Sequence, residues 1–174
     1  MLKIFLSLYE EPLIIFVRKG LKIETFADFT GKKIAAGEDG SGTRKIVEQL
    51  LADNELSDKD DIELVPLGGT EGAKALLAGN VDALMMVIRA DSQIVQQLFV
   101  DKNVDLVSLD RAEAYTRLHN YLSHIVLVEG VLDMAKNIPN KAYHLIAPSA
   151  TLVAHQDIHP ALVDLMMQVA EKGA

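Results

Sequence analysis

A glycine-rich segment, GEDGSGTR at residues 37–44, contains the residue types that hold a small anion. It follows a short apolar stretch at 33–36 and precedes apolar residues spaced along one face of a helix. Such a turn leaves backbone N–H groups unpaired at the start of the helix, where the helix dipole favours negative charge. Ser41 and Thr43 add hydroxyl donors, and Arg44 could form a bidentate pair with a carboxylate. The segment predicts an anion pocket, although an ordinary capped turn would look the same.

The same segment does not match the sequence patterns of nucleotide sites. Two of its glycines have P-loop spacing, but residues 43–44 are Thr-Arg where that loop needs Lys followed by Ser or Thr. The dinucleotide fingerprint fails because Lys45 takes the place of its last glycine or alanine. Ser41 is not on a nucleophile elbow, since Asp39 replaces the first glycine of that motif. What remains is anion binding without chemistry on the bound group.

A second turn, Gly68-Gly69-Thr70, repeats this arrangement in the next strand–helix unit. Two such turns at the carboxyl ends of neighbouring parallel strands would flank one crevice. Thr70 could line that crevice, but an N-cap role is the simpler interpretation for it. Gly79 fits the end of the same helix.

Composition and charge limit the class of protein. A chain of 174 residues with 49% apolar side chains can bury a core as one domain or as two small lobes. The net charge of −8 argues against nucleic acid as a partner, because no Lys/Arg-rich run offsets it. The chain has no cysteine, and its five histidines lack the spacing of metal ligands, so thiol chemistry, a metal and a cofactor are not predicted. No apolar run is as long as a transmembrane helix, and the first residues do not form a convincing signal peptide.

The order of elements predicts an α/β fold. Strands are expected at 33–36, 62–66, 81–88 and 105–109, and helices at 42–52, 70–79 and 91–99. This alternation predicts a parallel sheet covered by helices on both faces. Beyond these elements, extended segments are expected at 2–8, 12–17, 124–130, 143–146 and 150–154, and a final helix at Pro160.

The regular middle of the chain differs from its two ends, which predicts two lobes. Residues 31–107 would form a continuous α/β lobe that carries the glycine-rich turn. Residues 1–30 and 108–174 would form the second lobe and the hinge, with strands near 13–17 and 150–154 crossing between the lobes. A ligand cleft between two lobes that close about a hinge follows from this arrangement.

Four segments together resemble one known family: SLYEEPLIIFVRK, FADFTGKKIAAGEDGSGTR, VDALMMV and NIPNKAYHLIAPSATLVAHQDIHPALVDLMMQ. The chain is similar over nearly all of its length to the solute-binding receptors of TRAP transporters, of the TAXI type. The resemblance is most specific in GKKIAAGEDGSGTR and HPALVDLMMQ. It implies a type 2 periplasmic-binding fold, in which two α/β lobes close on a small carboxylate-bearing solute. Glutamate, glutamine and related organic acids are the solutes that it suggests.

The resemblance also implies a site, a location and partners. Tyr9 and the turn Gly40-Ser41-Gly42-Thr43 would line the cleft, together with the end of the 81–88 strand near Arg89. The receptor would lie in the periplasm or on the extracytoplasmic face of the membrane and deliver its solute to the permease subunits. Family members usually carry a signal or anchor and a further strand–helix section before the first segment, so the outer lobe is expected to be incomplete here.

Two other classes of function stay open beside the receptor. A ligand-sensing regulatory domain can have the same fold, and a helix-turn-helix or transmembrane helix in preceding sequence would distinguish it. An enzyme on a similar two-lobed scaffold ranks last. The sequence contains no paired nucleophile and base, no metal-ligand set and no cofactor fingerprint, so no catalytic residue is predicted.

Overall fold

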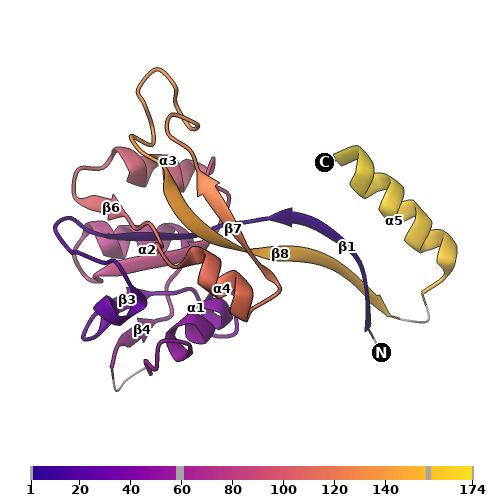
Figure 1. The fold of residues 1–174 in the computed structure, drawn as a ribbon, viewed down its shortest axis with the longest axis horizontal. Helices are drawn as coiled ribbons and strands as arrows, with labels where there is room; N and C mark the ends of the chain where they lie inside the picture. The colour runs from indigo at the N-terminus through magenta and orange to yellow at the C-terminus, as the bar shows by residue number, and fades with distance from the viewer. Residues whose placement is uncertain (1, 58–60, 156–157, 174) are drawn as a thin grey trace.

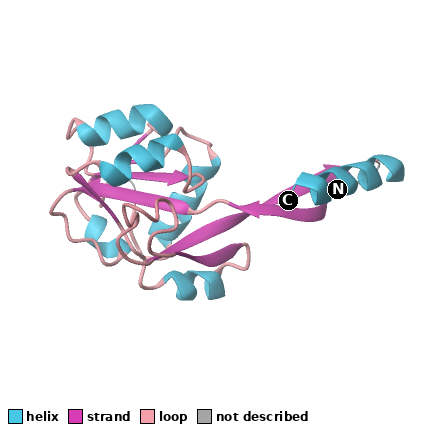
Figure 2. Cartoon of the chain, turned by 90° about the horizontal axis from the view of Figure 1, so that it is seen from above, coloured by secondary structure: helices cyan, strands magenta, loops and turns pink. Residues whose placement is uncertain are grey.

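The structure is a computed structural model that describes residues 2–57, 61–155 and 158–173. In residues 2–9 and 150–155 it is the course of the backbone that is described. Figure 1 shows an α/β body from which a long two-stranded ribbon extends to a terminal helix. Both ends of the chain lie at the far end of this ribbon (Figures 1 and 2).

The body is built around a five-stranded sheet with the order β4-β3-β5-β2-β6. Its strands are β2 (Leu13–Arg18), β3 (Lys33–Ala35), β4 (Glu63–Val65), β5 (Ala83–Val87) and β6 (Val104–Leu106). Strand β3 is parallel to β4 and β5, as the alternating pattern predicts. Strand β2 is antiparallel to both β5 and β6, and its insertion between them was not predicted.

Helices cover both faces of this sheet. They are α1 (Gly42–Ala52), α2 (Gly69–Leu77), α3 (Gln93–Val100) and α4 (Ala112–Leu118), with a short 3₁₀ turn, η1 (Phe26–Phe29). One face packs on α1, η1 and α4, and the other packs on α2 and α3. Successive residues of β2 alternate between these two cores, and all but the last, Arg18, are buried. A strand that is buried on both faces has to be apolar throughout, which explains the run LIIFV.

A second sheet joins the body to the ribbon. Its strands have the order β1-β8-β7 and are β1 (Leu2–Glu10), β7 (Leu122–Leu127) and β8 (Tyr143–His155). Strand β7 pairs with the first part of β8 as far as Pro148, and β1 pairs with the rest from Ser149 onward. Pro148 therefore lies where β8 changes partner, a position at which a missing N–H does not interrupt a ladder. The two extended pieces predicted around Pro148 are thus one strand.

The last helix, α5 (Pro160–Gly173), begins at the predicted proline and lies near β1 at the end of the ribbon. We call β1, the β8 segment from Ser149 onward and α5 the arm. Residues 13–17, which were expected near a crossing between lobes, lie inside the body sheet, and the arm leaves the body through β1 and β8. The division into residues 31–107, 1–30 and 108–174 stays a prediction.

Candidate functional site

The glycine-rich segment forms the turn between β3 and α1, as the sequence predicts. Gly37 has a φ of +80°, and a Cβ atom there would lie 2.7 Å from Oγ of Ser41, so the turn requires glycine at this position. The Gly37 N–H donates to the Leu67 carbonyl at 2.8 Å. A Cβ atom on Gly68 would be 3.2 Å from the Gly37 Cα. The two glycine-rich turns therefore lie side by side, as expected for turns that follow neighbouring parallel strands.

The start of α1 leaves two backbone donors without an acceptor inside the helix. Ser41 is the N-cap, and its Oγ accepts from the Arg44 N–H at 3.1 Å. The N–H groups of Gly42 and Thr43 precede the first intrahelical bond and have no acceptor in the helix. Thr43 Oγ1 accepts from the Val87 N–H at 3.2 Å, which fixes α1 against the end of β5. Each of the two hydroxyl groups still has its own proton to donate.

Gly42 and Thr43, which carry these two donors, line a pocket of about 400 Å³ at the root of the arm. Its lining comes from the connection between β1 and β2, the start of α1, the end of β5 and the middle of β8. The lining residues are Glu11, Gly42, Thr43, Ile46, Val87, Pro148 and Ser149. We call this hollow the root pocket.

Another hollow, of about 330 Å³, lies between α3, β6 and residues 136–143. It is polar, and residues such as Lys19 and Asp105 line it, but these two side chains already form an ion pair with each other. No helix begins at this second hollow in the part of the chain that the structure describes. Because backbone donors at a helix start are the feature that the sequence predicts for anion binding, the root pocket is the candidate site.

Arg44 does not line the root pocket, although it was predicted to pair with a ligand carboxylate. Its side chain is buried, and its Nε donates to Glu48 Oε1 at 2.7 Å. Glu48 lies one helical turn further on, where an oppositely charged side chain is a ready partner. A role for Arg44 in ligand binding stays a prediction, and it would require the guanidinium to leave this carboxylate.

Arg89 is exposed and forms a two-pronged ion pair with Asp91, with N–O distances of 3.0 and 2.7 Å. Hydrogen bonding to Asp91 raises the pKa of the Arg89 guanidinium, and hydrogen bonding to Arg89 lowers the pKa of the Asp91 carboxyl. Arg89 does not line the root pocket. Its predicted place near the end of β5 is right, and its predicted contact with a ligand stays a prediction.

The remaining predicted residues lie in different surroundings. Thr70 is an exposed residue of α2, and the N-cap of that helix is Gly68, so the expected N-cap role is wrong. Gly40 is part of the first turn, with a φ of +79°. The backbone of Tyr9 lies in β1 opposite Ala150, but the Tyr9 side chain lies outside the described part of the structure. Its role in the cleft stays a prediction.

The most informative residue that the sequence reasoning missed is Glu11. The pair Glu10-Glu11 looked like a solvated loop, yet Glu11 is half-buried and lines the root pocket. The connection is held in place because the Ile88 N–H donates to the Pro12 carbonyl at 3.2 Å. The only sequence signal was the position of Glu11 two residues after Tyr9, inside a segment that carries the family resemblance.

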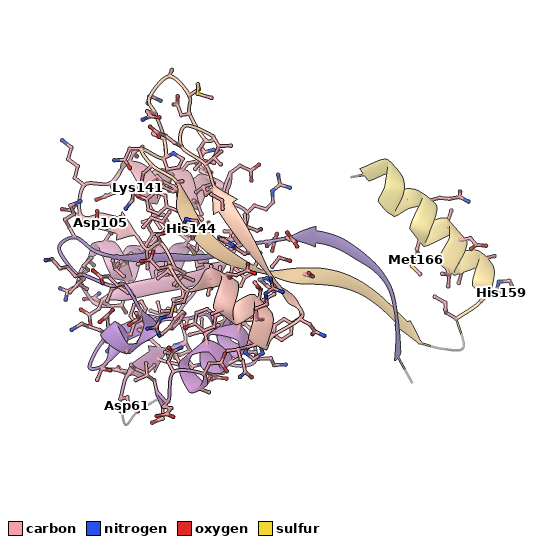
Figure 3. The ribbon with its side chains drawn as sticks, in the orientation of Figure 1. Asp61, Asp105, Lys141, His144, His159 and Met166 are labelled. Atoms are coloured by element: carbon pink, nitrogen blue, oxygen red, sulfur yellow. The ribbon has the colours of Figure 1, made fainter. Side chains whose placement is uncertain are left out.

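The structure also brings together two histidines that the sequence separates. His124 Nε2 and His144 Nδ1 lie 2.9 Å apart on the neighbouring strands β7 and β8. Figure 3 shows His144 in the body, away from the root of the arm. No group of three His, Cys, Asp or Glu residues that could hold a metal is present among residues 2–57, 61–155 and 158–173.

Solved structures with a similar fold include a periplasmic sulfonate-binding protein and two substrate-binding proteins of amino acid transporters. The periplasmic sulfonate-binding protein SsuA of Methylobacillus flagellatus KT is 17% identical over 97% of this chain and 40% of its own, with a TM-score of 0.53. The substrate-binding protein of an amino acid ABC transporter is 13% identical over 98% of this chain and 57% of its own, with a TM-score of 0.52. AbpA of Streptococcus pneumoniae, bound to L-arginine, is 15% identical over 98% of this chain and 54% of its own, with a TM-score of 0.51.

The fold is therefore that of the type 2 periplasmic binding proteins, as the family resemblance implies. The chain belongs to the NMT1-like family, whose model matches residues 1–170. It spans about 40% to 57% of the length of the three structures. None of the helices that the structure describes has both the length and the apolar composition of a membrane span.

Proposed function

We propose that the protein is an extracytoplasmic receptor that captures a small carboxylate-bearing solute and delivers it to the membrane permease subunits of a TRAP-type transporter. The observation that carries this proposal is that Gly42 and Thr43, whose N–H groups have no acceptor in α1, line the root pocket. A helix start of this kind favours an anionic oxygen group through both the donors and the helix dipole.

Membership of the family and the fold both support binding rather than catalysis. The ligands named for the similar structures are a sulfonate, an amino acid and L-arginine, and each carries an anionic oxygen group. The root pocket lies where the arm leaves the body, so a segment that moves with the arm would also change the shape of the pocket. This is the arrangement that a hinge-closing receptor needs.

The binding test compares Gly42→Asp with Gly42→Ala. A Cβ atom on Gly42 would meet no other atom within 4 Å, so neither substitution causes a clash at its Cβ position. An aspartate in the first turn stabilises the helix but places a negative charge beside the two donors. We expect Gly42→Asp to lower the affinity for the solute by about a hundredfold or more, and Gly42→Ala to change it by less than about threefold.

The measurement is isothermal titration calorimetry with the complete protein. Native mass spectrometry of the gently purified protein identifies a retained solute first, and L-glutamate and L-glutamine are the probes if none is retained. Circular dichroism confirms that both variants fold. Unchanged affinity in Gly42→Asp would remove the proposed anion site.

The transport partner is tested separately, because the similar structures named above include components of ABC transporters. A TRAP-type permease is a secondary transporter, so it draws on an ion gradient. Uptake of the solute by vesicles that contain the permease and this receptor should require that gradient and continue without ATP. Uptake that requires ATP would contradict the TRAP assignment and leave the binding site in place.

A further inference from the structure

The root pocket has no unengaged arginine beside its two backbone donors, among the residues that the structure describes. Arg44 and Arg89 are the two arginines near the site, and both hold carboxylates of the protein, Glu48 and Asp91. A solute carboxylate would therefore meet backbone N–H groups and hydroxyls on this side of the site, rather than a fixed cation. The charge that faces the solute from the pocket lining is negative and belongs to Glu11.

Among the side chains that the structure describes, Glu11 is the one ionisable group in the lining of the root pocket. Within the described residues it forms no hydrogen bond or ion pair, although it is half-buried. The negative charge of Glu11 helps to raise the pKa of Arg89. Asp91 raises that pKa more, through its hydrogen bonds and its own charge, so Arg89 already has a closer partner. A half-buried carboxylate without a partner costs free energy unless a bound group compensates for it.

The position of Glu11 is fixed by the elements on either side of it. Glu10 pairs with Ser149 across β1 and β8, and Leu13 pairs with Val87 across β2 and β5. Both Ser149 and Val87 line the root pocket, and Thr43 accepts the Val87 N–H. The carboxylate of Glu11 and the two donors of α1 therefore face one hollow from different elements.

We propose that Glu11 holds the ammonium group of the solute, so that the receptor selects α-amino acids over acids that lack the amine. This inference rests on the proposed function, because it requires the solute carboxylate at the start of α1. An α-amino acid carries its two opposite charges on adjacent atoms, and each would meet its complement in the root pocket. A plain carboxylate would bring a second negative charge next to Glu11, which disfavours it.

The test uses pairs of solutes that differ in the amine: L-glutamate with glutarate, and L-glutamine with glutaramate. Glu11→Gln keeps the shape of the side chain and removes its charge. Glu10→Gln is the matched control, since Glu10 is exposed, adjacent and not part of the pocket lining. Affinities are measured by calorimetry with the complete protein, and circular dichroism confirms folding.

We expect the unaltered protein to bind the better amino acid at least tenfold more tightly than its deaminated partner. Glu11→Gln should weaken binding of that amino acid by about tenfold to a hundredfold, as for the loss of a charge-assisted hydrogen bond, and leave the deaminated acid as tight or tighter. Glu10→Gln should leave both affinities unchanged. If Glu11→Gln changes the affinities for both solutes by the same factor, or changes neither affinity, the inference is overturned.

The outcomes separate this inference from the proposed function. If Gly42→Asp abolishes binding while Glu11→Gln keeps the preference for the amine, the anion site stands and the role of Glu11 is wrong. If the unaltered protein binds the deaminated acid as tightly as the amino acid, the role of Glu11 is likewise wrong while the anion site stands, and if Gly42→Asp binds normally, both fail.

Discussion

The body and the arm use the same kinds of element but differ in how much of their apolar surface is covered. In the body, all of β2 except its last residue is at most 2% exposed, and helices pack on both faces of the sheet. In the arm, Leu162, Leu165 and Val169 of α5 are 51% to 64% exposed. Met166, which is half-buried, lies on the side of α5 toward the arm strands (Figure 3).

This difference indicates which region stabilises the fold and where the candidate site lies relative to it. A sheet covered on both faces can hold its strand ends rigidly, whereas a ribbon of two strands is only marginally stable by itself. The root pocket lies at the boundary between them: Gly42, Thr43 and Val87 come from the body, and Ser149 comes from the arm. The rigid part carries the backbone donors, and the less covered part carries one wall of the pocket.

The largest expected effect on stability is at Phe16, in the middle of β2. Its side chain is 1% exposed and packs edge-on against Phe99, with the ring centres 5.5 Å apart. We expect Phe16→Ala to lower the free energy of unfolding by about 3–5 kcal/mol, because the cavity lies between two packed layers. Denaturant unfolding followed by circular dichroism measures this value. A loss below about 1 kcal/mol would mean that the body is not the more tightly packed region.

The next largest effect on stability is expected to differ between two glycines of the same turn. Gly37 and Gly40 have similar positive φ values, of +80° and +79°, but a Cβ atom would meet Ser41 Oγ at Gly37 and nothing within 4 Å at Gly40. In both alanine variants the left-handed conformation lowers the free energy of unfolding, by about 1 kcal/mol or more. We expect Gly37→Ala to cost more stability and to weaken solute binding, because it also displaces the N-cap of α1. Equal losses of stability and affinity in the two variants would show that strain alone matters.

Local patterns predicted the elements of the body well. Helix α1 spans the predicted residues 42–52, because its N-cap and its apolar spacing are set by neighbours in the sequence. The start of α5 at Pro160 was predicted for the same reason. The insertion of β2 between β5 and β6 was not predicted, since it depends on pairing between residues about 70 to 90 positions apart, which no local pattern encodes.

The residues of the candidate site likewise divide into those that local sequence patterns predict and those that depend on pairing between distant segments. The donors at Gly42 and Thr43 follow from the turn and helix pattern. The partner of Arg44 could have been found in the sequence, because Glu48 lies at the i+4 position. Glu11 could not, because its place in the root pocket depends on β1 pairing with β8 and β2 pairing with β5.

A smaller effect on stability, which depends on pH, is expected at the turn η1 on the edge of the body. The Asp28 carboxylate accepts from the N–H groups of Thr25 at 2.8 Å and Glu24 at 3.0 Å, and these hydrogen bonds lower the pKa of Asp28. A lowered pKa in the folded state means that the stabilisation is present above the pKa of the unfolded chain, near 4, and is lost as the pH falls through the folded value.

Asp28→Asn removes the charge and keeps an acceptor. We expect it to lower the free energy of unfolding by about 0.5–1 kcal/mol at pH 7, as for a weakened helix cap. The difference from the unaltered protein should shrink as the pH falls below about 4 and through the lowered folded pKa of Asp28, because below that pKa Asp28 is neutral in both states of the unaltered protein. Urea unfolding at pH 7 and at pH 3 measures it. A difference of the same size at both pH values would assign the effect to packing instead of charge.

The smallest effect is expected in the arm, where the same substitution can be compared with the body. Leu165 in α5 is 56% exposed and Leu50 in α1 is fully buried. Leucine and alanine both favour helices, so Leu→Ala at each site mainly reports lost burial. Leu50→Ala should cost about 2–5 kcal/mol, and Leu165→Ala should change the free energy of unfolding by less than about 0.5 kcal/mol. If Leu165→Ala instead costs more than about 1 kcal/mol, or if its cost grows with protein concentration, then α5 is covered in solution and the contrast between body and arm does not hold there. Denaturant unfolding at two protein concentrations distinguishes these results.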